Sequence, residues 1–386
     1  MYFFITFLAA LLVFGAVIAI HEFGHFSVAK LCGIQVNEFS IGMGPALWKK
    51  THKGTQYSLR LLPVGGYVAL EGEESPESQQ AEKGEHTDAE PQTPPPCAGA
   101  DSSPDGGAGN EEAPAQPVGK PLNEAAVWQR ALIMAAGAFM NFLLGFVVMV
   151  ILIAAQSEPI TSRVIYAIDD SALCGQTGLE AGDKVLAVNG RRCFVANDML
   201  YELMRTEDYS ARFTVLRGGE KVELPCVRFD TWQDDRGETH MSLGFTVYGI
   251  RKTPANVVKE AWNSVLYYGR IIFTSLMDLL RGRESINDLS GPVGIVTAIG
   301  QAASYGWQDL LQLLVLITVN LGIFNLLPFP ALDGGKVVFL LIEGVTGHAV
   351  PEKIQSGLTL AAFALLFGLM LFATYNDIVR LITGAV

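Results

Sequence analysis

The first thirty residues form an almost unbroken apolar run that ends in three polar side chains. About 20 apolar residues precede His21, which is long enough for a helix that crosses a bilayer. His21, Glu22 and His25 then follow with the spacing H-E-x-x-H, and on a helix the two histidines share one face. Polar groups at such a position are costly and usually functional. Residues 1–30 therefore predict a transmembrane helix that carries a site.

The chemistry of this motif points to a metal. Two imidazoles at this spacing can hold one zinc ion, and Glu22 beside them can take a proton from water. Zinc needs at least a third protein ligand and a fourth position open to water. The competing interpretation is a helix end whose histidines meet lipid headgroups. A signal peptide is disfavoured, since no basic residue precedes the run and no small-residue cleavage site follows it.

Composition supports a membrane protein. Of 386 residues 50% are hydrophobic and only 17% are charged, whereas soluble domains carry about 25% charged residues. The net charge of -12 is local, because residues 71–120 hold 12 acidic and 2 basic residues, a sum of -10. No basic stripe with interleaved aromatic residues is present, so the sequence gives no indication of nucleic-acid binding. Five cysteines without C-x-x-C spacing give no metal cluster.

The pattern along the chain predicts a polytopic α-helical membrane protein with about four transmembrane helices. The other three spans are expected in residues 127–155, in 307–335, where the helix leads into a loop containing Asp333, and in 354–373. Residues 254–300 carry apolar side chains at helical spacing and are expected to form an amphipathic juxtamembrane region.

Two further segments connect these spans on the same side as the motif. Residues 31–70 contain short β-type runs broken by glycines, which predict a membrane-associated β-hairpin. It is either a plain hairpin or one that presents an edge to which a substrate adds as a strand. Residues 71–120 hold eight prolines and no aromatic residue, and are expected to form a disordered cytosolic tether.

Residues 159–229 predict an inserted α+β domain. The segment Gly178–Gly190 reads G-L-x-x-G-D-x-V-L-x-V-N-G and resembles the PDZ domains of bacterial proteases. Such domains bind chain ends or exposed strands by β-addition, and the ligand here is not identified by the sequence.

Charge asymmetry places the motif and Asp333 at one membrane depth. Five basic residues against Glu38 follow the first span, which puts this loop in the cytosol: Lys30, Lys49, Lys50, Lys53 and Arg60. Four alternating spans then bring Asp333 to the cytosolic end of the third. A carboxylate is an acceptable third zinc ligand, but Asp333 is equally suited to cap a following helix. Asn141, inside the second span, is expected to make a helix–helix hydrogen bond.

Taken together, His21–His25, the segment Asn325–Gly335 and the PDZ-like segment resemble the site-2 protease family of intramembrane zinc metalloproteases. The resemblance is greatest to its PDZ-containing, RseP-like bacterial branch. It implies zinc bound by His21, His25 and Asp333, with Glu22 as the catalytic acid and base.

The resemblance also implies where substrate binds and what it is. Asn325 matches the substrate-contacting asparagine of the family, and Pro328 and Pro330 shape the loop beside it. The implied substrates are single-span membrane proteins, such as anti-sigma factors or remnant signal peptides. The implied location is the bacterial inner membrane, with the active site near the cytosolic side and the PDZ domain extracytoplasmic. The alternatives are a non-enzymatic PDZ membrane scaffold and a transporter. The sequence has no internal repeat that would support a transporter.

Overall fold

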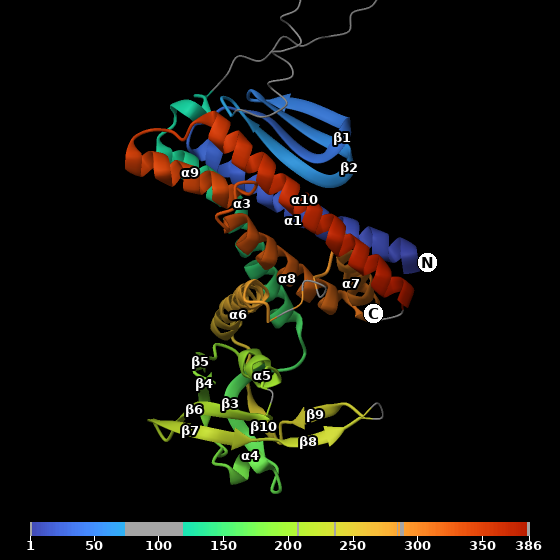
Figure 1. Cartoon of the computed structure of the whole chain (residues 1–386), viewed down its shortest axis with the longest axis vertical. Coiled ribbons are helices and arrows are strands. Elements are labelled where there is room, and N and C mark those ends of the chain that lie inside the picture. Colours follow the sequence, from blue (N-terminus) through green and yellow to red (C-terminus); the bar gives the residue numbers. More distant parts are fainter. Residues whose placement is uncertain are drawn as a thin grey trace, which may run out of the picture.

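Apolar helices form one part of the molecule and a small β-rich domain forms the other (Figure 1). The computed structural model describes residues 2–73, 119–206, 208–234, 237–283, 285 and 289–383. Residues 74–118, which make up most of the predicted tether 71–120, lie outside the described residues.

Four described helices are long and apolar enough to cross a membrane, as the apolar runs predict. They are α1 (Tyr2–Leu31), α3 (Val127–Ala155), α8 (Trp307–Leu326) and α10 (Glu352–Thr383). Helix α3 packs against both α1 and α8. Small residues permit the close approach: a Cβ on Gly24 of α1 would lie 2.5 Å from the Ala136 oxygen of α3. The chain is therefore a membrane protein with a compact three-helix centre.

The predicted hairpin is present, but it folds back on itself. Strands β1 (Val36–His52) and β2 (Thr55–Leu70) pair antiparallel, and Phe39 is opposite both Tyr57 and Val68. Glycines with positive φ bend the two strands, among them Gly44 (φ 84°) and Gly65 (φ 95°). The result is four short segments in the order 46–52, 55–62, 36–43 and 66–70, so residues 66–70 form one edge of the sheet.

Backbone hydrogen bonds join the residues on either side of this sheet to residues 120–122, which precede α3. The Gln35 nitrogen donates to the Lys120 oxygen at 2.9 Å, and the Leu122 nitrogen donates to the Glu71 oxygen at 2.7 Å. The chain on either side of residues 74–118 thus returns to one place, next to the short helix η1 (Leu122–Glu124).

The α+β domain is a twisted antiparallel sheet in the order β10-β3-β4-β6-β7, with β5 paired to β4. Its buried core contains Leu179, Val185 and Phe213. Strand β10 pairs with β3, so the domain continues to Ile250 and does not end near Phe229 as the sequence pattern suggests. Its elements are β3 (Ile160–Ile168), α4 (Leu173–Gln176), β4 (Lys184–Val188), β5 (Arg191–Arg192), α5 (Ala196–Met204), β6 (Ser210–Arg217), β7 (Glu220–Arg228), β8 (Asp230–Gln233), β9 (Thr239–Ser242) and β10 (Phe245–Ile250).

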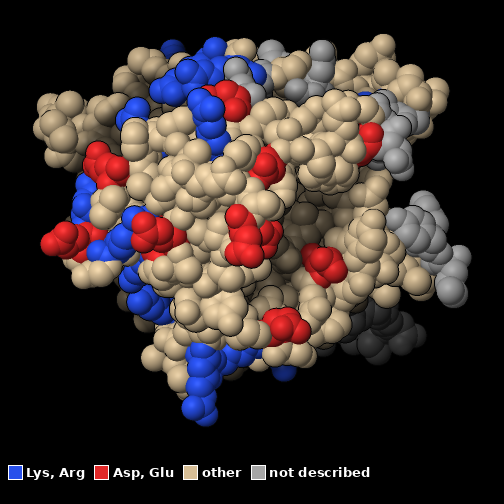
Figure 2. All heavy atoms as spheres, turned by 90° about the horizontal axis from the view of Figure 1, so that it is seen from below, with Lys and Arg blue, Asp and Glu red and all other residues tan. Residues whose placement is uncertain are grey.

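Helix α6 (Pro254–Leu280) joins this domain to the membrane helices. Its apolar side, with Val257, Ala261 and Val265, packs into the core shared with α3 and α8. Its polar side meets α5 through ion pairs, and Arg205 Nη2 lies 2.5 Å from Asp278 Oδ2. Figure 2 shows acidic and basic groups interspersed at the end of the molecule that carries the domain, as is typical of a solvated surface.

Two more helices complete the membrane part. Helix α7 (Pro292–Tyr305) packs against α1, α8 and α10, and α9 (Asp333–Thr346) packs against α3. The region 254–300, expected as one juxtamembrane segment, is thus divided between α6 and the start of α7.

Candidate metal centre

Three side chains converge at the end of α1. The Nε2 atoms of His21 and His25 lie 3.3 Å apart, one helical turn from each other. The Oδ2 atom of Asp333 lies 3.2 Å from His21 Nε2 and 3.4 Å from His25 Nε2. The three atoms therefore form a nearly equilateral triangle, although Asp333 comes from a helix more than three hundred residues further along the chain.

Asp333 reaches this triangle from the first turn of α9 and does not act as the helix cap. The N-cap is Leu332, and the cap makes no side-chain hydrogen bond. The Oδ2 atom of Asp333 is buried and has no hydrogen-bond partner among the described residues. Of the two roles that the sequence leaves open, the geometry favours an oxygen directed at the histidines.

Two glycines allow the loop before α9 to pack tightly. A Cβ on Gly334 would lie 2.2 Å from the Leu327 oxygen, and one on Gly335 would lie 2.3 Å from the Phe329 oxygen. Pro328 and Pro330 lie in this loop, where the oxygen of Pro330 accepts a hydrogen bond from Thr359 Oγ1 at 3.3 Å. The loop that the prolines open is therefore held against α10 and α9.

A missing side chain on α3 makes room for the two imidazoles. A Cβ on Gly137 would lie 2.3 Å from His25 Nε2 and 2.6 Å from His21 Cε1, which is closer than real Cβ atoms approach. Helix α3 also orients one ring, because His25 Nδ1 lies 2.7 Å from the Ile133 oxygen. A hydrogen bond of this kind holds the ring with Nε2 facing the centre.

Two asparagines lie against the other ring. Asn141 Nδ2 of α3 is 3.3 Å from His21 Nδ1, and Asn325 Nδ2 of α8 is 3.5 Å from both ring nitrogens of His21. The sequence predicts Asn325 as a site residue and predicts a helix–helix hydrogen bond for Asn141. The structure shows that bond between α3 and α1, and its partner, which the sequence does not identify, is His21. The available signal was the four-residue spacing between Gly137 and Asn141, which puts both on one face of α3.

Glu22 faces the edge of the β-sheet. A Cβ on Gly66 would lie 3.1 Å from Glu22 Cγ, so the backbone at Gly66, where the edge segment 66–70 begins, lies against this side chain. The other membrane acids that the sequence offers as rivals are engaged elsewhere. Glu343 pairs with Arg130, and Asp377 accepts hydrogen bonds from two backbone N–H groups of α7's first turn.

The comparison with known families decides the class of this centre. The model of peptidase family M50 matches residues 9–369. The chain belongs to peptidase family M50, the site-2 proteases. The match extends over the triangle, the β-sheet and the α+β domain together.

Individual M50 relatives agree over nearly their whole length. A protein of Clostridium perfringens whose name assigns it to the zinc metalloproteases is 32% identical over 373 residues, covering 96% of this chain and 97% of the relative. The zinc metalloprotease RasP of Geobacillus kaustophilus is 31% identical over 410 residues, with 95% and 96% covered. The regulator of sigma-W protease RasP of Bacillus subtilis is 28% identical, with 97% and 99% covered. This M50 chain is a zinc metalloprotease.

The donor set of the M50 chain fits zinc. Tetrahedral zinc with ligands at about 2.0–2.1 Å separates neighbouring ligand atoms by about 3.3 Å, and the three edges here are 3.2, 3.3 and 3.4 Å. Two imidazole nitrogens and one carboxylate oxygen leave a fourth position, as in catalytic zinc sites. A buried carboxylate oxygen without a hydrogen-bond partner is stabilised by a cation, so the Oδ2 of Asp333 also fits the role of a metal ligand.

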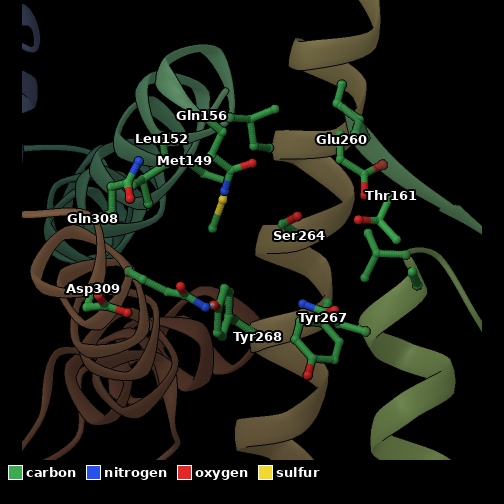
Figure 3. Close-up of a pocket in the computed structure, with 16 residues that line it drawn as sticks. Met149, Leu152, Gln156, Thr161, Glu260, Ser264, Tyr267, Tyr268, Gln308 and Asp309 are labelled. Atoms are coloured by element: carbon green, nitrogen blue, oxygen red, sulfur yellow. Dashed lines mark hydrogen bonds between the residues drawn. The ribbon is translucent and has the colours of Figure 1, made fainter. Parts of the chain in front are cut away.

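A groove lies where the membrane helices meet the α+β domain. It has a volume of about 280 Å³ and is lined by α3, α6, α8 and the first turn of α5 (Figure 3). Glu260, Tyr267 and Asp309 line it, and it contains none of the residues of the metal centre. The groove lies at the beginning of α8, whereas Asn325 is in the last turn of α8 and Asp333 follows it, so the groove and the metal centre are separated by the length of α8.

Proposed function

We propose that this M50 protease is an intramembrane endopeptidase that hydrolyses peptide bonds in or near the transmembrane segment of single-span membrane proteins. The observation that carries the proposal is the convergence of His21, His25 and Asp333 at one end of a bundle of apolar helices. A site so placed is reached by a substrate that is itself in the membrane.

In this proposal His21, His25 and Asp333 hold zinc, and Glu22 is the catalytic acid and base. Zinc, when bound, supplies a Lewis acid and lowers the pKa of a water toward 7. Glu22 takes the proton of the attacking water and passes it to the leaving nitrogen. Asn325 binds the substrate backbone with its amide, and Pro328 and Pro330 fix the loop that presents Asp333.

The β-sheet is proposed to hold the substrate extended. A transmembrane helix hides its carbonyl groups in hydrogen bonds, so it must open before it can be cut. Residues 66–70 form an edge of the sheet beside Glu22 and pair within the sheet only with residues 36–41. An opened substrate segment that adds to this edge as a strand would bring its peptide bonds to Glu22.

The α+β domain is proposed to be a PDZ domain that selects substrates by binding chain ends or exposed strands. The antiparallel sheet with the short helices α4 and α5 is compatible with this role. The proposed location is the bacterial inner membrane, with the metal centre near the cytosolic side and the domain outside. Because one relative is named a regulator of sigma-W protease, anti-sigma factors are the first substrates to test, and remnant signal peptides the second.

Zinc content and cleavage of a single-span substrate, measured on the same detergent-purified proteins, test the proposal. Wild type is expected to hold one zinc and to cleave. Glu22→Gln, an isosteric change, should keep zinc and lose cleavage, and His21→Ala should lose both. Cleavage by Glu22→Gln at the wild-type rate would overturn the role of Glu22, and a wild type without zinc would overturn the metal centre.

A further inference from the structure

The two imidazoles of the metal centre are oriented by different partners. His25 donates from Nδ1 to the backbone oxygen of Ile133 at 2.7 Å. The corresponding atom of His21 faces side-chain amides instead, Asn141 at 3.3 Å and Asn325 at 3.5 Å. Only a hydrogen-bond acceptor at this position holds His21 in the form that binds a metal through Nε2.

The reason is the proton count of the ring. A neutral imidazole carries one N–H, so a ring whose Nε2 lone pair faces a metal must be protonated at Nδ1. The Nε2 atom of His21 lies on the triangle with His25 and Asp333, so its Nδ1 is the donor. The nearest group to that donor is the side-chain amide of Asn141, which has both an oxygen and a nitrogen.

The amide of Asn141 has a free acceptor. Its Oδ1 is buried and has no hydrogen-bond partner among the described residues, whereas its Nδ2 is the atom 3.3 Å from His21 Nδ1. The oxygen and nitrogen of an amide are assigned by their hydrogen bonds, since the two orientations have nearly the same shape. Turning the amide by 180° replaces the contact between Nδ2 and His21 Nδ1 with a hydrogen bond from the Nδ1–H of His21 to Oδ1, and it moves Nδ2 to the position of the unpartnered Oδ1.

We infer that Asn141 is a positioning residue whose Oδ1 accepts the Nδ1–H hydrogen bond of His21 and so directs His21 Nε2 at the zinc. The inference rests on the proposed metal centre and adds a residue to it. It also gives different roles to the two asparagines beside the His21 ring. Asn141 orients the His21 ring, and Asn325 stays available to bind substrate.

The position of Asn141 suits this task. Its side chain is fully buried, and its backbone oxygen accepts a hydrogen bond from Thr318 Oγ1 of α8 at 3.1 Å. Gly137, one turn earlier on the same face, removes the side chain that would displace the His21 ring. Helix α3 therefore provides the space and the acceptor for the His21 ring at one point.

Two nearly isosteric substitutions of Asn141 test the inference, because it predicts which of the two variants binds zinc more tightly. Asn141→Asp keeps an acceptor, and Asn141→Leu removes it. Zinc affinity is measured without substrate, by competition with a chromophoric chelator. Loss of a hydrogen bond to a ligating histidine typically costs 10–100-fold in metal affinity. We therefore expect Asn141→Leu to lose about that factor and Asn141→Asp to bind zinc as tightly as wild type or more tightly.

If Asn141 merely fills space between helices, the order of the two zinc affinities is reversed. Leucine would then be tolerated, and a buried carboxylate without a donor would be the harmful change. If Asn141→Leu does not fold, Asn141→Asp still decides, because weakened zinc binding by this variant overturns the inference. Thr318→Val is the matched control: it removes the α3–α8 hydrogen bond without touching His21 and should leave zinc affinity unchanged.

The outcomes separate this inference from the proposed function. If wild type binds no zinc, the metal centre itself fails. If wild type binds zinc and both Asn141 variants bind it equally well, only the role of Asn141 is overturned.

Discussion

Gly137 of α3 packs directly against the ring of His25: a Cβ on Gly137 would lie 2.3 Å from His25 Nε2. Atoms under 3.0 Å apart in this way require something to move, and here the neighbour is a ring whose other nitrogen is already held by the Ile133 oxygen at 2.7 Å. The place of His21 and His25, the proposed zinc ligands on α1, thus depends on a side chain that α3 does not have.

Gly137→Ala is expected to abolish zinc binding and cleavage while the protein still folds. Alanine favours a helix interior by about 1 kcal/mol over glycine, so α3 itself gains, but the new methyl group displaces His25 and His21. Zinc content and helix content of the purified variant check this. Gly15→Ala on α1 is the control, since nothing lies within 4 Å of its Cβ. Wild-type zinc content in Gly137→Ala would show that the rings can shift without cost.

Arg270 of α6 ties the α+β domain to the membrane helices. Its Nη2 contacts Asp198 and lies 3.9 Å from Glu202 Oε1, two carboxylates of α5 with 0% and 5% exposed side chains. Arg270→Met removes the ion pair of the buried Asp198 and leaves Glu202 with Arg191 at 3.5 Å. Breaking a buried ion pair typically costs about 3–5 kcal/mol. We expect a lower free energy of unfolding and faster hydrogen exchange in α5.

The matched control for Arg270 is an exposed ion pair in the same domain. Lys221 and Glu223 lie 3.4 Å apart with 63% and 67% exposed side chains. Lys221→Met should change the free energy of unfolding by less than about 1 kcal/mol. Equal effects of the two substitutions would mean that Arg270 does not bear on the attachment of the domain.

Local patterns were enough to predict the membrane helices. The run 127–155 coincides with α3, because an apolar segment of this length has no other stable form in a bilayer. The shared position of His21 and His25 could also be predicted, since residues four apart on a helix lie on the same face. The convergence with Asp333 followed from counting spans and charges, which sets membrane depth but no distance.

Long-range pairing was not visible in the same way. Strand β10 pairs with β3 across about eighty residues of sequence. The six residues of β10, which end in Gly249 and Ile250, have no pattern that identifies β3 as the partner strand. The doubling back of β1 and β2 depends on positive-φ glycines whose register only the folded sheet determines. The helix–helix hydrogen bond of Asn141 is predicted by the sequence, but its partner His21 is not, because a buried polar residue in a helix has many possible partners.

Asp377 of α10 serves as the cap of another helix. Its carboxylate accepts hydrogen bonds from the backbone nitrogens of Gly291 at 3.2 Å and Gly294 at 2.7 Å, at the start of α7, which makes no side-chain cap of its own. Asp377→Ala leaves two N–H groups unpaired and removes an anion from a helix N-terminus. We expect a loss of about 1–3 kcal/mol, measured by thermal unfolding in detergent.

Helix α10 should also loosen from α7 in this variant. Faster hydrogen exchange of the first turn of α7 would report it, and Tyr375→Phe, on the exposed side of α10, should leave exchange unchanged. Unchanged protection of Gly294 in Asp377→Ala would show that water or another group replaces the carboxylate.

Glu260 gives the stability of the protein a pH dependence. Its side chain projects into the groove between α6 and the α+β domain (Figure 3). Burial raises the pKa of Glu260 from 4.5 to about 6. The positive charges of Arg163 and Lys259 lower this pKa, and the negative charge of Asp198 raises it slightly. The folded state therefore holds the proton more tightly than the unfolded state. Its contribution to stability is fully present below the unfolded pKa of 4.5 and is lost as pH rises through about 6.

Glu260→Gln removes this dependence, because glutamine is neutral at every pH. The variant should gain stability relative to wild type as pH rises from 4.5 to 7.5 (thermal unfolding of both proteins at several pH values measures the difference). The control is Glu220→Gln on the exposed start of β7, whose difference from wild type should stay constant over the same range. A constant difference for Glu260→Gln as well would mean that the Glu260 carboxyl is solvated in the groove and titrates like an exposed acid.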